Sequence, residues 1–148
     1  WDQVQKDEDT LQEYTDSIHR RMKYLSHAPI LTVSALTGQR VSKIFDIIRK
    51  ASESRRVRIS TGVLNNLFVP DLSEKFSARN PAAKLGIRYI TQASSDPPTF
   101  VVFTSGTKPL HFSTERYLVN QLREKFGFYA APIRIQQRLK KRRKLAGG

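Results

Sequence analysis

Two groups of residues in this sequence have the types and spacing needed for binding chemistry. The first is the loop Ser34-Ala35-Leu36, which follows the short apolar run 30–33 and precedes Gly38. In open α/β sheets, ligands bind at the carboxyl ends of buried strands, so this loop lies where a ligand site is expected. A tight strand-to-helix turn explains Ser and Gly here at least as well, and both interpretations stay open at this point.

The second group is a dense run of cations near the carboxyl terminus. Seven basic residues fall within eleven positions and are able to contact several phosphates, with binding that weakens steeply as salt is added. These residues are Arg134, Arg138, Lys140, Lys141, Arg142, Arg143 and Lys144. A solubilising tail is the alternative, but blocks of one charge often act as binding arms, so we favour an RNA contact.

Hydrolytic, thiol and metal chemistry find little support in the sequence. The chain has no Cys, which excludes a disulfide framework, a thiol nucleophile and Cys-ligated metal sites. His19, His27 and His111 lack metal-ligand spacing, and no nucleophile-elbow motif frames a Ser. No apolar stretch has the length of a membrane span. We therefore predict no catalytic residue, no metal site and no membrane partner.

The charge is spread unevenly along the 148 residues. Lys and Arg number 26 against 13 Asp and Glu, and residues 1–54 hold eight of each. All of the net charge of +13 therefore lies in residues 55–148 and favours an acidic partner, above all nucleic acid. The asymmetry predicts a first unit at 1–54, a linker at 55–61, a second unit at 62–138 and a basic tail at 139–148.

The first unit has the pattern of a helix, a strand and a helix. Apolar residues recur at spacings of three and four over about 9–25 and again over 41–51, which predicts two amphipathic helices. The run 30–33 between them is typical of a strand buried on both faces of a parallel sheet. This order predicts the closing edge of an α/β nucleotide-binding domain. Residues 1–54 alone should be unstable, because the strand would lack its sheet.

The second unit begins with an apolar helical stripe over 64–76 and continues with two strands. Pro70 should break or kink the helix at about Val69. Residues 87–93 and 99–104 are rich in β-branched and aromatic side chains, and the turn between them predicts a hairpin. Tyr89, Phe100 and Phe103 are able to stack on bases, although their alternation favours core packing.

A second helix and a last strand complete this unit. Ser113 should cap the amino end of the helix and Gly127 should end it. Ile133 and Ile135 then alternate with Arg134 in a strand that leads into the basic tail. The order α-β-β-α-β predicts an α+β domain, a small sheet covered on one face by helices.

Taken together, these motifs resemble those of a known family. Trp1-Asp2, a helix and then Ser34-Ala35-Leu36 resemble the last third of a P-loop GTPase domain, where the guanine-specificity motif Asn-Lys-x-Asp is followed by Ser-Ala-Leu. Later motifs narrow the resemblance to the Der family, also called EngA, which comprises bacterial GTPases with two tandem G domains and a C-terminal KH-like domain. Those motifs include Leu36-Thr37-Gly38-Gln39-Arg40-Val41, Tyr89-Ile90-Thr91-Gln92, Pro97-Pro98-Thr99-Phe100 and Phe126-Gly127-Phe128.

The resemblance implies site residues in the first unit. Residues 1–54 would end the second G domain and about 60–140 would form the KH-like domain. The carboxylate of Asp2 would accept hydrogen bonds from guanine N1 and N2, and the backbone N–H of Ala35 would meet O6. Ser34 and Leu36 would shape the loop. The chain would then be a fragment of a longer protein that binds GTP or GDP with Mg²⁺, while the fragment itself would bind none of these tightly.

The implied partners are the large ribosomal subunit, with its rRNA and proteins, and the remaining G domains of the same protein. The implied place is the bacterial cytoplasm, with an organelle stroma or matrix as the alternative. We hypothesise the C-terminal part of a ribosome-assembly GTPase whose KH-like domain docks on the large-subunit precursor. The alternative is that this domain is an intramolecular regulatory scaffold for the G domains without direct RNA binding. A third possibility is a stand-alone basic RNA-binding domain.

The sequence also departs from the family pattern. It lacks the P-loop motif Gly-x-x-x-x-Gly-Lys-[Ser/Thr] and any Asp-x-x-Gly switch, so this chain should not hydrolyse GTP. No two glycines stand three apart, so the Gly-x-x-Gly clamp of nucleic-acid-binding KH domains is also absent. Asp96 replaces the basic residue more common in the family. Any RNA binding must therefore depend on charge rather than on the usual KH loop.

Overall fold

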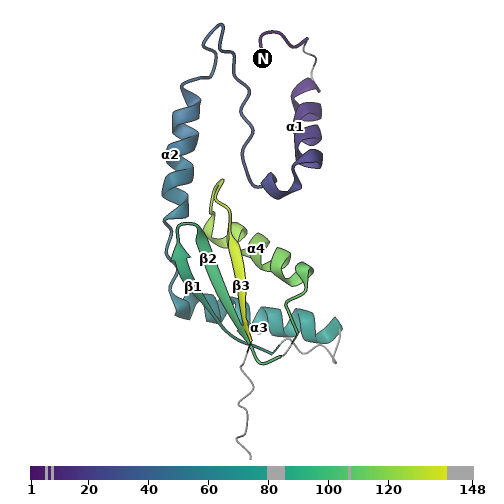
Figure 1. Cartoon of the computed structure of the whole chain (residues 1–148), viewed down its shortest axis with the longest axis vertical. Coiled ribbons are helices and arrows are strands. Elements are labelled where there is room, and N and C mark those ends of the chain that lie inside the picture. Colours follow the sequence, from purple (N-terminus) through teal and green to yellow (C-terminus); the bar gives the residue numbers. More distant parts are fainter. Residues whose placement is uncertain (6, 8, 80–85, 107, 140–148) are drawn as a thin grey trace, which may run out of the picture.

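The computed structural model describes residues 1–5, 7, 9–79, 86–106 and 108–139 (Figure 1). The elements follow in the order α1 (Thr10–Arg21), the 3-10 helix η1 (Lys23–Leu25), α2 (Lys43–Arg55), α3 (Thr61–Arg79), β1 (Ile87–Ser95), β2 (Pro98–Thr104), α4 (Phe112–Phe126) and β3 (Arg134–Leu139). Figure 1 shows α1 and α2 extending away from the sheet, while α3 and α4 lie against it. No helix in the described ranges is long and apolar enough to cross a membrane.

The three strands form one mixed sheet in the order β1-β2-β3. β1 and β2 are an antiparallel hairpin with Ile90 opposite Val102. β2 and β3 are parallel, with Phe100 beside Ile135, and α4 makes the crossover that a parallel pair requires. The predicted order α-β-β-α-β is therefore confirmed for the second unit.

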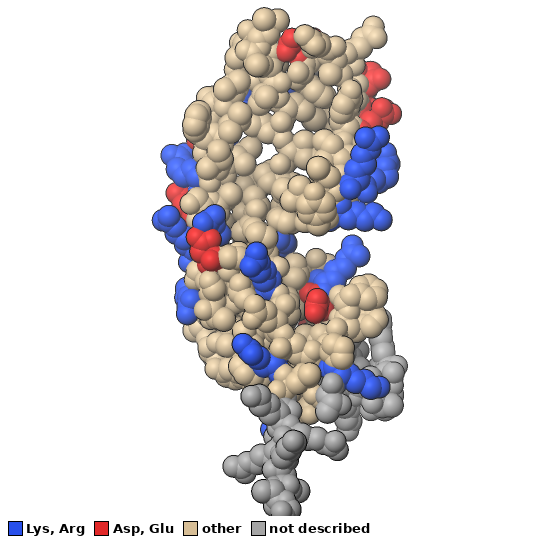
Figure 2. Space-filling view, viewed as in Figure 1, with Lys and Arg blue, Asp and Glu red and all other residues tan. Residues whose placement is uncertain are grey.

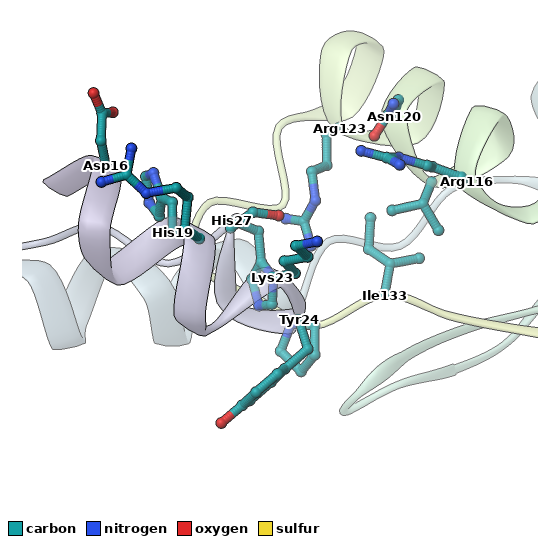
Figure 3. A pocket seen from close by; sticks show the side chains of 13 residues that line it. Asp16, His19, Lys23, Tyr24, His27, Arg116, Asn120, Arg123 and Ile133 are labelled. Atoms are coloured by element: carbon teal, nitrogen blue, oxygen red, sulfur yellow. The ribbon is translucent and has the colours of Figure 1, made fainter.

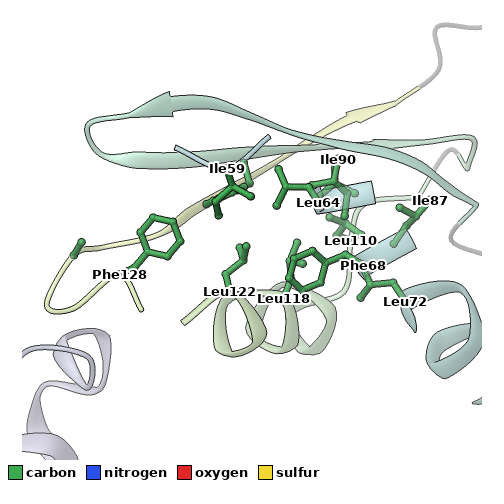
Figure 4. Close-up of a cluster of buried hydrophobic side chains, with 13 residues drawn as sticks. Ile59, Leu64, Phe68, Leu72, Ile87, Ile90, Leu110, Leu118, Leu122 and Phe128 are labelled. Atoms are coloured by element: carbon green, nitrogen blue, oxygen red, sulfur yellow. The ribbon is translucent and has the colours of Figure 1, made fainter. Parts of the chain in front are cut away.

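The core lies between one face of this sheet and the helices α3 and α4 (Figure 4). Leu64, Phe68 and Leu72 recur every four residues along α3, so they share one face, and each is at most 1% exposed. Full burial of each such side chain contributes roughly 1.5–3 kcal/mol. The whole buried cluster comprises Ile59, Leu64, Phe68, Leu72, Ile87, Ile90, Phe100, Val102, Leu110, Leu118, Leu122, Phe128 and Ala131.

Amide side chains join the helical layer to the exposed edge of β1. Asn65 on α3 accepts the Ile90 N–H at 2.9 Å and donates to the Ile90 carbonyl at 3.0 Å. Gln92 accepts the Ile59 N–H at 2.8 Å and donates to the Val57 carbonyl at 2.9 Å. The Asn65 contacts satisfy backbone groups that the edge strand β1 would otherwise leave unpaired, and the Gln92 contacts join β1 to the segment before α3.

The helix boundaries correct two predictions and confirm a third. α3 runs through Pro70 without a break, because the buried side chains on both sides of Pro70 hold the helix against the core. His111, rather than Ser113, caps α4, since its ring nitrogen accepts the Ser113 N–H at 3.3 Å. Gly127 ends α4 with a φ of +87°, as predicted.

The strand predicted at 30–33 is wrong. These residues are only partly buried and belong to no strand, because no partner strand of the described chain lies beside them. The flanking helices are confirmed, although the first splits into α1, which ends at Arg21, and the separate turn η1. The first unit therefore consists of helices joined by an extended segment.

Candidate guanine loop and nucleic-acid interface

The amino terminus lies beside the Ser34-Ala35-Leu36 loop. The Trp1 ammonium group donates to the Val33 carbonyl at 3.0 Å. A hydrogen bond from the Ser34 hydroxyl group is the largest of the effects that lower the pKa of Asp2 below its usual value. The fold thus brings together two side chains that are 32 positions apart in the sequence, and it keeps the Asp2 carboxylate ionised.

Ser34 shapes this loop from the inside. It is 1% exposed, its hydroxyl accepts the Thr37 N–H at 3.1 Å, and its N–H donates to the Gln39 carbonyl at 3.2 Å. Gly38 takes a left-handed φ of +71° that closes the turn. Ala35 is exposed, and Leu36 is 83% exposed. The loop is therefore a fixed tight turn that presents its Ala35-Leu36 tip outward.

The two helices beside the loop expose their apolar stripes. Phe45 and Ile48 on α2 are 72% and 58% exposed, and Leu11 and Tyr14 on α1 are about half exposed. The periodicity that predicted these faces was correct, but no layer of the described chain covers them. Exposed apolar side chains that cluster on one helix face often mark a surface that contacts other protein.

The face of the sheet opposite the core carries a row of aromatic and cationic residues. Tyr89, Phe103 and Arg138 lie side by side in the register of the three strands. The rings of Tyr89 and Phe103 are 5.5 Å apart, and the two side chains are 42% and 38% exposed. Core packing is confirmed for Phe100 and is wrong for Tyr89 and Phe103. Phe103 is three residues after Phe100 and so lies on the opposite face of β2, and a register shift between Ile87 and Tyr89 places Tyr89 on the opposite face from Ile87.

The predicted RNA-binding cations divide into two groups. Arg134 and Arg138 are exposed on β3, and neither pairs with a carboxylate of the described residues. Both lie in the strand that precedes the tail, and β3 extends to Leu139. Lys140, Lys141, Arg142, Arg143 and Lys144 lie outside the described residues.

A second basic surface, which sequence reasoning missed, lies between the two units (Figure 3). This cleft has a volume of about 920 Å³ and is bounded by α1 and η1 on one side and by α4 on the other. Its charged lining residues are Asp16, Arg20, Lys23, Arg116 and Arg123. The sequence offers one partial signal, the helical spacing of Arg116 and Arg123, but nothing local shows that α1 lies opposite them.

The linker between the units is held by specific contacts. Arg55 forms an ion pair with Asp96 in the β1–β2 turn, and Arg58 donates to the Ser95 hydroxyl at 3.3 Å. Lys50 on α2 lies over the Tyr129 ring, 4.3 Å from its centroid. Asp96, which replaces the basic residue more common in the family, thus pairs with the end of α2 in this chain.

Comparison with known proteins identifies the family. Residues 58–138 match the family described as the KH-domain-like region of EngA bacterial GTPase enzymes, C-terminal. A GTPase Der of Acetivibrio thermocellus is 40% identical over 142 residues, which cover 96% of this chain and 32% of the relative. A GTPase Der of Bacillus cytotoxicus is 41% identical over 135 residues, which cover 91% and 31%.

The match extends across both units of the chain but not across the whole relatives. A GTPase Der of Lactobacillus johnsonii is 40% identical over 141 residues, which cover 95% of this chain and 32% of the relative. The chain thus spans about a third of the length of the curated relatives that it matches. The chain belongs to the Der (EngA) family of GTPases, and its second unit is the KH-like domain with which these proteins end.

Proposed function

We propose that this chain is the C-terminal part of a ribosome-assembly GTPase and that its KH-like unit docks on rRNA of the large-subunit precursor. The observation that carries the proposal is the charge of this unit, since the whole excess of +13 lies in residues 55–148. A unit with that excess releases counterions when it meets a phosphate backbone, and this release drives binding.

The open face of the sheet supports the same proposal. Arg134 and Arg138 would contact phosphates, while the exposed rings of Tyr89 and Phe103 would offer stacking surfaces for unpaired bases. Stacking of one base on an aromatic side chain is worth roughly 1–3 kcal/mol and tolerates many sequences. The absence of a Gly-x-x-Gly loop is compatible with this mode, because stacking and charge do not require that clamp.

In the longer protein, the first unit would complete a guanine pocket. Asp2 would accept two hydrogen bonds from guanine, and the Ala35 backbone N–H would donate to O6. Adenine would leave these groups unpaired, which is how such a site rejects the wrong base. GTP or GDP with Mg²⁺ would bind to the longer protein in the bacterial cytoplasm, and the phosphate-binding machinery would lie outside this chain. The division at residues 54 and 62 would separate the G-domain part from the KH-like part.

A second function is favoured by one specific observation. The open sheet face carries the partly exposed rings of Tyr89 and Phe103 side by side on neighbouring strands. Such a face also suits contact with a neighbouring G domain of the same protein. The KH-like unit would then act as an intramolecular regulatory scaffold.

Substitution on β3 separates these two functions. The double variant Arg134→Gln and Arg138→Gln should bind large-subunit rRNA about tenfold or more weakly at moderate salt, because two phosphate contacts are lost. The matched control, Lys43→Gln with Arg49→Gln on α2, removes the same charge from the first unit and should bind as the unchanged chain does. A chain that ends at Leu139 keeps β3 whole and tests the tail by itself. Absence of rRNA binding by all four proteins would favour the scaffold.

A further inference from the structure

We propose that the cleft between α1–η1 and α4 binds the phosphate backbone of an RNA strand. This inference rests on the proposed function and adds a site to it. Figure 2 shows the surface notched between the α1 side and the α4 side, with Lys and Arg gathered on both sides of the notch. The cleft is thus lined with positive charge from both of the units that the linker joins.

Positive charge in the cleft is not balanced by carboxylates. Arg20, Lys23, Arg116 and Arg123 line it together with a single acidic residue, Asp16. The Asp16 carboxylate accepts a hydrogen bond from Gln12 at 3.0 Å, and Figure 3 shows it at the far end from Arg123. None of the four cations pairs with a carboxylate of the described residues. Like charges gathered at a concave surface raise the local concentration of an anion.

Arg123 is fixed in place without being neutralised. Its guanidinium group donates to the carbonyls of Phe128 at 2.8 Å and Ala131 at 2.7 Å. These carbonyls orient the group but leave its charge in place, and partial burial lowers the pKa of Arg123 below its usual value. A phosphate oxygen beside Arg123 would supply the missing negative charge.

Two imidazoles, those of His19 and His27, also line these walls. Burial and the nearby Arg123 charge lower the pKa of His27, so its ring is neutral at neutral pH and retains one N–H donor. The Nε2 atom of His19 is buried and has no hydrogen-bond partner among the described residues. Figure 3 shows Lys23, His27 and Arg123 converging from the two walls.

The shape of the cleft favours a strand over a single nucleotide. Its volume of about 920 Å³ is near the upper end of the range for small-molecule pockets, and its cations are divided between two separate elements. Among the residues that line it, Tyr24 is the one Phe, Tyr or Trp, so no pair of rings encloses a base. Cations on facing walls suit successive phosphates of a backbone.

The three histidines make a direct test possible. His19 and His27 line the cleft, whereas His111 caps the far helix end and serves as an internal reference. We would follow the ring resonances of the 148-residue chain by NMR while adding a single-stranded RNA octamer or inorganic phosphate. The octamer should shift His19 and His27 saturably, leave His111 unchanged and raise the pKa of His27. A response to inorganic phosphate without a response to the octamer would overturn the proposal.

Matched charge variants separate this proposal from the proposed function. Arg20→Gln with Arg116→Gln removes two charges from the cleft, and Arg21→Gln with Lys125→Gln removes two exposed charges from the same helices outside it. The cleft variant should bind the octamer about tenfold more weakly. The slope of its log affinity against log salt should also be shallower by about 0.7 for each phosphate contact that is lost. Overlaid amide spectra would show that both variants remain folded.

The outcomes are distinct. If both variants bind RNA equally well and the His19 and His27 resonances do not shift, the cleft site is overturned and the proposed function stands. Absence of RNA binding by the unchanged chain at low salt would overturn both.

Discussion

The two units of this chain use the same amphipathic pattern with opposite results. Along α3, Leu64, Phe68 and Leu72 are almost completely buried against the sheet. Along α2, Phe45 and Ile48 lie on an equally regular stripe and are mostly exposed. The difference is the presence of a covering layer, since the second unit contains its own sheet and the first does not. Periodicity thus predicts which face is apolar, while burial depends on what else folds beside it.

The first unit also shows which local structure persists without a sheet. The extended segment 30–33 pairs with no strand, whereas the turn after it is held by the Ser34 hydroxyl and by Gly38. Turn geometry depends on hydrogen bonds within five or six residues, while a strand needs a partner from a distant part of the chain. The proposed guanine loop is thus preformed even though its strand is not.

The largest expected effect is the loss of stability when a buried phenylalanine of the second unit is replaced, and an exposed phenylalanine of the first unit is its control. Phe68→Ala should lower the free energy of unfolding by about 3–5 kcal/mol, because it leaves a cavity among fully buried side chains. Phe45→Ala, in the exposed stripe of α2, should change it by about 0.5 kcal/mol or less. Urea denaturation followed by circular dichroism measures both. Equal losses would show that the first unit has a core of its own.

A second pair of substitutions compares neighbouring asparagines of α3. Asn65→Ala should cost about 1–3 kcal/mol, since it leaves the Ile90 N–H and carbonyl without their partner at the sheet edge. Asn66→Ala is the control, because Asn66 is exposed one position away, and its stability should stay nearly constant. Amide hydrogen exchange at Ile90 should accelerate in the first variant alone. Unchanged protection there would contradict the role given to Asn65.

Replacing either of two glycines of the second unit with Ala should change the free energy of unfolding, in opposite directions. Gly127→Ala should destabilise by about 1–2 kcal/mol, because an L side chain is strained at a φ of +87°. Gly62→Ala should stabilise by about 0.5–1 kcal/mol, since Gly62 lies in the first turn of α3 and an added Cβ meets no atom within 4 Å. Thermal unfolding of the two variants reports both signs. A gain in stability for Gly127→Ala would contradict the helix-end geometry.

The smallest expected effect concerns the ionisation of Asp2. The Ser34 hydroxyl lowers the pKa of Asp2, so Ser34→Ala should raise it toward the usual value. Because the pKa is lower in the fold, the contact stabilises above the unfolded pKa and is lost as the pH falls through the folded pKa. An NMR titration of the Asp2 carboxyl carbon measures the shift. An unchanged midpoint in Ser34→Ala would show that the two side chains do not interact.

Local signals predicted much of the second unit. The hairpin, the end of α4 at Gly127 and the order α-β-β-α-β all follow from periodicity and turn residues close together in the sequence. The predictions at Pro70 and Ser113 were wrong for physical reasons that are visible in the fold. Packing on both sides of Pro70 keeps its helix continuous, and a ring nitrogen replaces the expected serine hydroxyl as the cap.

The candidate sites were only partly predictable, because they depend on contacts between distant segments. Asp2 and Ser34 were paired through the family resemblance alone, and the fold brings them into contact. The outward position of Tyr89 follows from a register shift that no propensity encodes. The basic cleft joins Arg20 and Arg116, which are 96 positions apart, so no local pattern was able to indicate it.

The central claim, that the basic second unit docks on rRNA, is tested most directly by the salt dependence of binding. The 148-residue chain would be titrated with a large-subunit rRNA fragment and with an unrelated RNA of equal length at several salt concentrations. The proposal predicts tighter binding of the rRNA fragment and a steep linear fall of log affinity with log salt for both. Absence of binding to either RNA at low salt would contradict it.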